Sequence, residues 1–514
     1  MLTTNELLRQ EWTRFRRPGR LIAMAAAALT VLVLGLLYAN GNHASCDGPC
    51  PADPRGPDGS LVSDQFSFLH RDLGQNGSIT VRLTFMTGTI TYPPPNHDAI
   101  VPGLVPWAKA GIIVKDGVRQ GSSYAALMLT GGHGVRMQYD YTHDIAGSAG
   151  GVSARSPRWL RLTRSGDTLT GDESVDGSQW AKVGVAKLSG LPRTVQVGLF
   201  ATSPGDLTLR RVGLGGATEE TRFTQAGGTF DHVGVEGAVS TGGWRSDLVG
   251  EMNHTDWEKY HKASGAVEAN GTVTVTGAGD IGPMGTDGGR PAERTLTGLT
   301  PALLILLVVA VRFVTAEHRR GAAGGAPLTR QALAAKAIVA GAATFVTGLL
   351  SVGTVLPAGL AILRSNGIPV IEPSALTEVR VVVGLAAVLA LTAVLALALA
   401  AVLRRTWPAI LLAITTLALP YAVTAVPLLP DTLSRRLLRT TPAAGFATQQ
   451  TLTEYPQVIA HYAPSAGYFP LPWWAGTGVL CMYVAVVLGV ALRRVPGTGE
   501  GKGRARGACR TSLL

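Results

Sequence analysis

Long uncharged apolar blocks near both ends of the chain are separated by a stretch in which apolar and polar residues alternate. Each block is about as long as the helix of roughly 20 residues that crosses a bilayer with its backbone groups paired internally. The stretch between them, 40–295, contains no such block, so we expect it to fold as a separate domain. The pattern predicts six membrane-spanning helices, at 20–39, 296–315, 337–363, 381–403, 407–428 and 473–492.

The stretch 40–295 has the apolar period of strands rather than of helices. Apolar and polar residues alternate from Ile79 to Phe85, from Val135 to Tyr139 and from Val195 to Leu199. Turn-forming residues separate such runs, as at Arg164–Asp167. Many short strands joined by tight turns are typical of a sandwich. We therefore predict a membrane α-helical protein with an all-β, jelly-roll-like sandwich inserted between its first two spans.

The segment 1–19 precedes the first span and has a pattern of its own. The pattern Thr3–Glu6 is a capping-box signature for the start of a helix. Leu8, Trp12 and Phe15 follow at helical spacing, and arginines occupy other positions. We expect an amphipathic helix that lies along the inner membrane surface.

Charge is divided unevenly between the two parts of the chain. The stretch 41–295 carries 22 Lys and Arg against 26 Asp and Glu, a net charge of −4. Since the whole chain has a net charge of +11, the remaining residues carry +15. The basic excess therefore belongs to the ends of the spans, where it faces anionic headgroups, and it does not indicate nucleic-acid binding.

The basic residues lie mainly at alternate connections between the spans. They are concentrated in 1–19, in the connection 316–336, at Arg404 and Arg405, and in the tail 493–514. By the positive-inside rule these segments are cytoplasmic, so both termini lie inside the cell and 40–295 lies outside. One basic cluster does not fit this orientation. The outer loop 429–472, which could re-enter the bilayer, contains Arg435, Arg436 and Arg439.

Two cysteines follow the first span in a turn-rich stretch. Cys46 and Cys50 are close enough in sequence for a local disulfide, which suits an extracytoplasmic segment. A metal site would need two further ligands nearby, and only His43 offers itself. We therefore predict a disulfide between the two cysteines and no metal site.

The connection between the second and third spans carries a motif. It lies in FVTAEHRRGAAGGAPLTRQALAAKAIVAGAATFVTGLL (313–350), where Thr-Ala-Glu, a basic pair and Gly precede a short helix and a Lys-led span. This stretch resembles the corresponding loop of type 2 ABC exporter permeases. In that family the loop contains a coupling helix that docks into the ATPase subunit and passes its motion into the bilayer. The resemblance assigns this role to Glu317, Arg319, Arg320, Gly321, Pro327, Arg330 and Lys336.

Other parts of the membrane region resemble the same family. The start of the chain looks like its elbow helix, 396–413 like its connection from the fourth to the fifth span, and 437–450 with 471–494 like its last outer loop and final span. The resemblance implies an ABC ATPase subunit as partner and a homodimer or heterodimer of permeases in the lipid bilayer. ATP belongs on that partner, and no cofactor is expected here, because GTGEGKGR (497–504) lacks the spacing of a phosphate-binding loop.

The domain between the first two spans has a resemblance of its own. Segments 107–117, 124–139 and 159–180 resemble concanavalin A-like and laminin-G-like jelly rolls, and the likeness extends over about residues 62–215. That family often binds carbohydrate, but no single residue carries the property over, and large aromatics in a sandwich are more often core. No catalytic residue stands out, because the histidines and carboxylates lack a catalytic motif.

These patterns lead to one main hypothesis and one alternative. The main hypothesis is the permease subunit of an ATP-driven exporter in the cell membrane, without enzymatic activity of its own. Three roles stay open for its outer domain, which are to select the cargo, to recruit a partner or to cap the exit. The alternative is a membrane-anchored glycan-binding or sensor protein in which the sandwich recognises an envelope glycan. Association with an ATPase separates the two.

Overall fold

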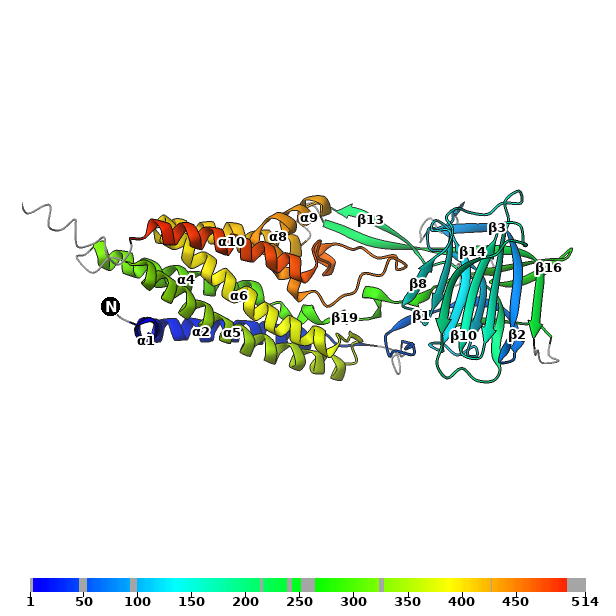
Figure 1. Ribbon diagram of the computed structural model, residues 1–514, viewed down its shortest axis with the longest axis horizontal. Helices are drawn as coiled ribbons and strands as arrows, with labels where there is room; N and C mark the ends of the chain where they lie inside the picture. Colours follow the sequence, from blue (N-terminus) through cyan, green and yellow to red (C-terminus); the bar gives the residue numbers. More distant parts are fainter. Residues whose placement is uncertain are drawn as a thin grey trace, which may run out of the picture.

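Helices and strands occupy opposite ends of an elongated molecule (Figure 1). The structure, a computed structural model, describes residues 3–45, 53–92, 99–212, 216–237, 243–250, 264–322, 328–426 and 428–496. Side chains are described for these residues except 211, 212, 216–218, 286, 287 and 319–322. The chain passes into the β domain after its first long helix and later returns to the helices through short strands and 3-10 turns.

Six helices are long and apolar enough to cross a membrane, as the hydrophobic blocks predict. They are α2 (Pro18–Gly41), α4 (Leu299–Ala322), α5 (Arg330–Ser365), α6 (Ala375–Leu403), the segment of α7 (Thr406–Ala413), the π-helical turn η3 (Ile414–Ala418) and α8 (Leu419–Ala425), and α10 (Trp473–Arg494).

The helices extend beyond the apolar blocks into the connection 316–336. Helix α4 continues to Ala322, and α5 begins at Arg330, where the Thr329 hydroxyl accepts a hydrogen bond from the Ala332 amide. Within the described part of this connection there is no separate short helix. Most of it is instead continuous with the two neighbouring spans.

Helix α6 lies at the centre of the bundle and contacts α4, α5, α7 and α10. It is apolar on all sides, as expected for a helix that others surround. Helices α2 and α10 lie at the margin, since 22% of the most apolar window of each is buried against 61% for α6.

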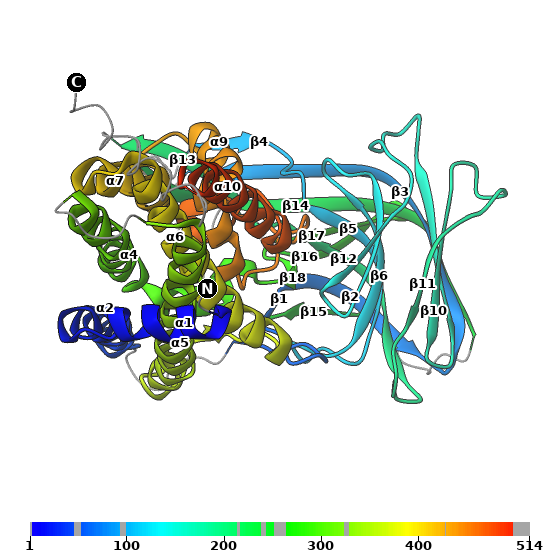
Figure 2. The ribbon, with the colours of Figure 1, turned by 60° about the vertical axis from the view of Figure 1, so that its left-hand side comes forward.

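Helix α1 (Thr4–Phe15) precedes the spans and runs across one end of the bundle (Figure 2). The predicted capping box is confirmed, because the Thr3 hydroxyl accepts from the Glu6 amide and the Glu6 carboxylate accepts from the Thr3 amide. The chain then extends at Arg17, and Pro18 begins α2 at a position where proline is well tolerated.

Two large antiparallel sheets form the outer domain. One has the order β11-β10-β9-β3-β14-β17-β16, with β4 on β3 and β13 on β14, and the other has the order β15-β2-β12-β5-β6-β7-β8. The bounds are β2 (Phe66–Leu73), β3 (Asn76–Thr91), β4 (Ile100–Pro102), β5 (Lys109–Lys115), β6 (Tyr124–Thr130), β7 (Val135–Tyr139), β8 (His143–Ala146), β9 (Arg158–Ser165), β10 (Thr168–Ser174), β11 (Ala181–Lys187), β12 (Val195–Thr202), β13 (Asp206–Val212), β14 (Gly216–Gly237), β15 (Arg245–Val249), β16 (Gly265–Ala269) and β17 (Thr272–Gly277).

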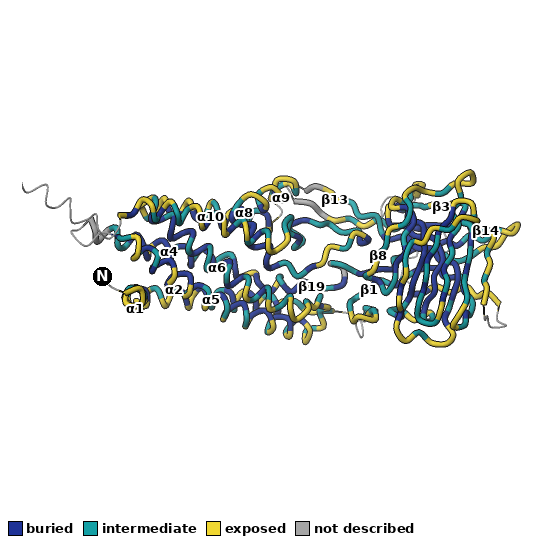
Figure 3. Tube along the Cα trace, in the orientation of Figure 1, coloured by how far each residue is buried: buried dark blue, intermediate teal, exposed yellow. Residues whose placement is uncertain are grey.

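The two sheets pack face to face around one hydrophobic core (Figure 3). In β3 the side chains of Ile79, Val81 and Leu83 are fully buried, whereas the polar residues between them are partly exposed. The predicted alternation and β-sandwich are therefore confirmed. Strands β14 to β17 extend the sandwich beyond residue 215, where the sequence resemblance ends.

A two-stranded ribbon joins the sandwich to the helices. It consists of β1 (Val62–Asp64) and β18 (Ile281–Pro283), which pair antiparallel where the chain enters and leaves the domain. We call this ribbon the neck. Val62 and Ile281 of the neck pack on the outer face of the seven-stranded sheet, in a second small core that includes Phe66 and Phe68.

The connection from the neck to α4 is short and pairs with the helical region. It contains η1 (Gly285–Gly288), β19 (Arg290–Pro291) and η2 (Ala292–Leu296), and β19 pairs with β20 (Val370–Ile371) between α5 and α6. The outer loop 429–472 contains α9 (Asp431–Thr440), η4 (Pro442–Gln449) and η5 (Pro464–Ala466). All eight residues of η4 are buried, and η4 packs against α6 and α10.

Candidate functional site

Four charged side chains meet at the end of the bundle farthest from the sandwich. The Lys336 Nζ lies 2.5 Å from Glu11 Oε2 and 2.6 Å from Glu317 Oε2. Arg14 Nη1 bridges the same two carboxylates, at 2.7 Å from Glu11 Oε1 and 2.9 Å from Glu317 Oε1. We call these four residues the inner cluster. It joins α1, α4 and α5, and its two positive and two negative charges balance.

Two members of the inner cluster are withdrawn from solvent, whereas the Arg14 side chain is 35% exposed and that of Glu317 is 15% exposed. The side chains of Lys336 and Glu11 are 2% and 1% exposed. Phe313 of α4 covers the cluster, with the Lys336 ammonium 4.2 Å from its ring centre and Phe15 packed edge-on against it. An ion pair held in such surroundings costs desolvation, so removing one partner is more harmful than removing both.

The seven residues assigned to coupling by resemblance do not share one environment. Glu317 and Lys336 meet inside the inner cluster and face the protein rather than a docking partner. Arg330 is exposed, and its Nε donates to the Val495 carbonyl after α10. Arg319, Arg320 and Gly321 belong to the last turn of α4, where side chains are not described, and Pro327 lies outside the described residues.

Sequence reasoning missed Glu11 and Arg14 as members of this site. Glu11 lies between Leu8 and Phe15 at helical spacing, on the face of α1 that turns inward. A carboxylate on the apolar face of an otherwise basic helix requires a cationic partner when that face is buried. That signal was present in the sequence, but its partner Lys336 could not be read from it.

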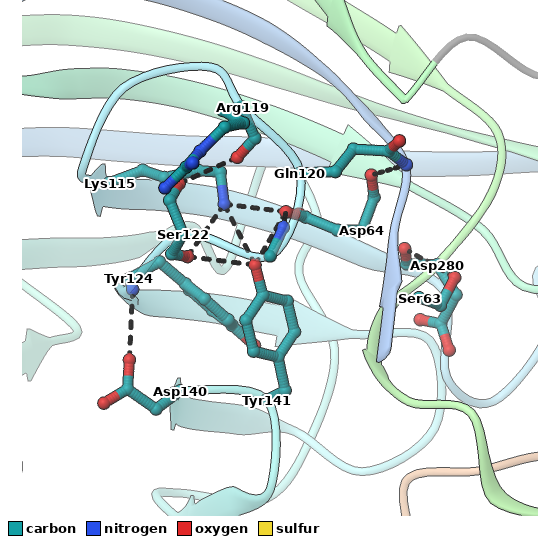
Figure 4. Close-up of polar contacts among 11 residues, drawn as sticks. Ser63, Asp64, Lys115, Arg119, Gln120, Ser122, Tyr124, Asp140, Tyr141 and Asp280 are labelled. Atoms are coloured by element: carbon teal, nitrogen blue, oxygen red, sulfur yellow. Dashed lines mark hydrogen bonds and ion pairs between the residues drawn. The ribbon is translucent and has the colours of Figure 1, made fainter. Parts of the chain in front are cut away.

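The neck is anchored by a second buried ion pair (Figure 4). Lys115 Nζ at the end of β5 lies 2.7 Å from Asp64 Oδ2 in β1, and both side chains are fully buried. The Tyr141 hydroxyl donates to the same carboxylate oxygen at 2.6 Å, and the Gly121 amide does so at 2.8 Å. Burial lowers the pKa of the Lys115 ammonium, and the Asp64 carboxylate opposes that shift.

A similar contact holds the other strand of the neck. Lys109 Nζ at the start of β5 lies 2.6 Å from Asp280 Oδ1, which immediately precedes β18, and also donates to the Ile281 carbonyl. The two ends of β5 therefore each fasten one strand of the neck. The sequence does not mark either lysine as buried, because each flanks one end of the uncharged run 110–114, where a charged residue normally meets solvent.

The outer end of the bundle holds another buried acidic residue. Glu293 in η2 accepts a hydrogen bond from the Thr451 hydroxyl, and its Oε1 has no hydrogen-bond partner within the described chain. Arg380 at the start of α6 faces it, and the Nε of that guanidinium is also unpartnered among the described residues. Burial raises the pKa of Glu293 to about 7.

The tryptophans of the sandwich are engaged by other side chains. Trp107 is 6% exposed and stacks on His133. Trp180 is covered by the Arg161 guanidinium, which lies 4.1 Å from a ring centre, and Arg82 and Arg71 lie over Trp159 and Trp244 respectively. These contacts favour structural roles over sugar stacking. Trp257 lies outside the described residues.

The predicted disulfide falls on residues that the structure does not describe, because Cys46 and Cys50 both lie in 46–52. Cys481 in α10 is a free, exposed thiol. Within the described ranges there is no group of three His, Cys, Asp or Glu side chains with the geometry of a metal site.

No protein-family model matches the chain. No curated protein matches it either. Three solved structures show distant likeness. A functionally unknown protein from Saccharomyces cerevisiae is 18% identical over 37% of this chain and 84% of its own, with a TM-score of 0.23. The GH43 BlXynB protein from Bacillus licheniformis is 16% identical over 32% and 28% of the two chains, with a TM-score of 0.21. Scytalido-glutamic peptidase with a transition state analog inhibitor is 10% identical over 42% and 98%, with a TM-score of 0.27. Likenesses this distant carry no argument about the function of the chain.

Proposed function

We propose that this chain is the permease subunit of an ATP-driven exporter that is energised by a separate ATPase subunit. The observation that carries the proposal is the inner cluster. It fastens the helix before the first span to both helices that flank the connection 316–336, which is the segment that resembles an ATPase-docking loop. A push on this connection therefore acts on three helices at once.

Helix α5 is long enough to transmit a displacement of the connection to the other end of the bundle. The helix runs for 36 residues from Arg330 to Ser365. At its far end the Asn366 side chain donates to the Ala39 and Asn42 carbonyls, where α2 ends. Because packed helices shift as rigid bodies, movement at the inner cluster is expected to reach the outer ends of α2 and α5 together.

In this proposal the inner cluster faces the cytoplasm and the sandwich lies outside the cell. The basic residues at alternate connections support that orientation. The marginal positions of α2 and α10 leave apolar surface for a second permease, in keeping with a dimer. The neck is held to the sandwich at both strands by β5, and the pairing of β19 with β20 joins the segment after the neck to the connection between α5 and α6.

Co-purification tests the proposal with a variant in the connection 316–336. Arg320→Glu combined with Gln331→Glu reverses one charge and adds another at two residues that are not members of the inner cluster, and Gln331 is exposed. We expect the full-length protein in mild detergent to retain an ATPase subunit in its native form and to lose it in this double variant. Arg405→Glu, a charge reversal at the exposed connection between α6 and α7, is the matched control and should retain the ATPase.

The outcome also separates the alternative hypothesis. A glycan-binding anchor predicts that no ATPase accompanies the native protein, or that the double variant and the control behave alike. Either result would rule out the permease proposal. Substitution of Glu317 is a poor test, because the loss of its ion pairs with Lys336 and Arg14 would disturb the bundle itself.

A further inference from the structure

A cleft of about 920 Å³ lies between the sandwich and the outer ends of the helices. The hairpin of β13 and β14 forms one wall, and the connection from the neck to η2 forms another. The outer loop supplies the remainder through residues 458–466 and the start of α9. The volume is within the range of about 300–1,000 Å³ that is typical of small-molecule sites.

Part of the cleft is apolar and adjoins the end of a span. Leu209 of β13 is 43% exposed, and its side chain lines the cleft together with Leu207. On the opposite side lie Ala425, the last residue of α8, and Ile459 of the outer loop. An apolar chain that leaves the bilayer beside α8 would meet these residues first.

The acidic residues of the cleft are already paired within the protein. Asp280 is bound by Lys109 at 2.6 Å. His461 lies between the other two, with Nε2 2.7 Å from Asp431 Oδ2 and Nδ1 3.2 Å from Glu219 Oε1. These contacts occupy the carboxylates that would otherwise attract a cationic ligand.

The two arginines of the cleft have no such partners. Within the described chain neither Arg290 nor Arg294 forms an ion pair, and both are exposed at the cleft. Arg294 Nη2 donates to the Ser465 carbonyl at 3.1 Å, which leaves most of its N–H groups available. The neighbouring Glu293 does not line the cleft, since its carboxylate is directed to Thr451. Guanidinium groups bind phosphate and carboxylate with paired hydrogen bonds.

We propose that this cleft binds an anionic amphiphile, with its phosphate or carboxylate head on Arg290 and Arg294 and its apolar part against Leu209 and Ile459. The ligand is either a phospholipid of the adjoining leaflet or the exported cargo. Only the second source rests on the proposed transport function.

Native mass spectrometry of the full-length protein in maltoside micelles tests the site. The probes are lysophosphatidylglycerol and lysophosphatidylcholine of equal chain length, which differ in net charge. We expect one anionic probe to bind per chain at a concentration at least about tenfold below that of the zwitterionic probe, because the two guanidinium groups that hold the phosphate repel the choline ammonium of the zwitterionic probe. Equal binding of the two probes would overturn the proposal.

Two variants and a control locate the binding. Arg290→Gln with Arg294→Gln should abolish the preference for the anionic probe, and Leu209→Asp should weaken its binding by about tenfold. The control is Arg493→Gln with Arg494→Gln, which removes the same amount of positive charge from two exposed residues at the C-terminal end of α10. It should retain the preference for the anionic probe. If the control pair loses the preference while the cleft pair keeps it, the cleft is not the site. Unchanged melting temperatures show that each variant is folded.

The molecule that co-purifies with the untreated protein identifies the source. A mass that matches a bulk phospholipid of the same membrane indicates the leaflet, and an anionic amphiphile absent from the bulk lipid indicates cargo. Loss of ATPase association in the Arg320→Glu and Gln331→Glu variant leaves binding in the cleft unaffected, so the two proposals fail separately.

Discussion

The ammonium group of Lys336 lies 2.5 Å from the carboxylate of Glu11, although 325 positions separate the two residues in the chain. Arg14 and Glu317 complete a neutral set of four charges around this contact. Since both members of the closest pair are almost fully buried, α1 is fixed to the bundle rather than free on a membrane surface. The cluster therefore makes one unit of α1, α4 and α5.

Lys336→Met should destabilise the full-length protein by about 3 kcal/mol, because Glu11 and Glu317 then share only Arg14 in a buried environment. Adding Glu11→Gln to this variant should recover part of the lost stability, since it removes the buried carboxylate charge that Lys336 no longer balances. Thermal unfolding in detergent of the two single variants and the double variant measures the coupling. Additive losses, within about 0.5 kcal/mol, would contradict a direct interaction between the two residues.

Asp64→Asn should loosen the neck, because Lys115 would lose the only carboxylate within ion-pair distance among the described residues. We expect a loss of about 3 kcal/mol, and a smaller loss of about 1 kcal/mol for Tyr141→Phe, which removes one hydrogen bond to the same oxygen. Tryptophan fluorescence during urea unfolding of the full chain measures this loss, since five of the nine tryptophans lie in 40–295. Arg210→Gln, which removes an exposed ion pair on β13, serves as control and should change stability little.

The elements that the sequence predicts well are those with a strong local pattern. Six apolar blocks and the Thr3–Glu6 capping box each depend on neighbours a few residues apart, and both reappear in the structure. The sandwich is less visible after residue 215, where glycines such as Gly227 and Gly228 replace apolar positions in β14. The sequence still indicates strands there, but it aligns none of them with the jelly-roll pattern, although β14 lies near the middle of its sheet.

The candidate sites were harder to predict, for a different reason. The resemblance of the connection 316–336 to a permease loop drew attention to Glu317 and Lys336, but their contact with α1 depends on tertiary packing. Lys115 follows the uncharged run 110–114 and precedes Asp116, as a residue at a surface turn would. Its burial follows from the neck, which covers the outer face of the sheet and comes from distant parts of the chain.

Gly35→Ala should destabilise the bundle, because α2 approaches its neighbours most closely at this residue. A Cβ at Gly35 would lie 2.3 Å from the Thr295 carbonyl oxygen and 2.4 Å from a Val355 methyl group. We expect a loss of at least about 2 kcal/mol, seen as a lower melting temperature. Gly489→Ala in α10 is the matched control, since a Cβ there has no atom within 4 Å, and it should be neutral or stabilising by up to about 1 kcal/mol. Equal effects of the two variants would show that this packing is absent.

The carboxyl group of Glu293 should make stability fall as pH rises. Its pKa is raised by burial from 4.5 to about 7, so between these values the folded protein holds a proton that the unfolded chain releases. The resulting contribution is complete below pH 4.5 and is lost as pH rises through about 7, a change of about 3 kcal/mol. Glu293→Gln keeps an acceptor for the Thr451 hydroxyl and removes the titration.

We therefore expect the melting temperature of the native protein, measured relative to that of Glu293→Gln, to decrease between pH 5 and pH 8. Glu454→Gln, a change at an exposed glutamate of the same outer loop, should follow the native protein at every pH. A constant difference between the native protein and Glu293→Gln would mean that the carboxyl group titrates at its ordinary pKa. The outer end of the bundle would then admit water to Glu293, and the unpartnered Arg380 Nε would face solvent rather than a buried acid.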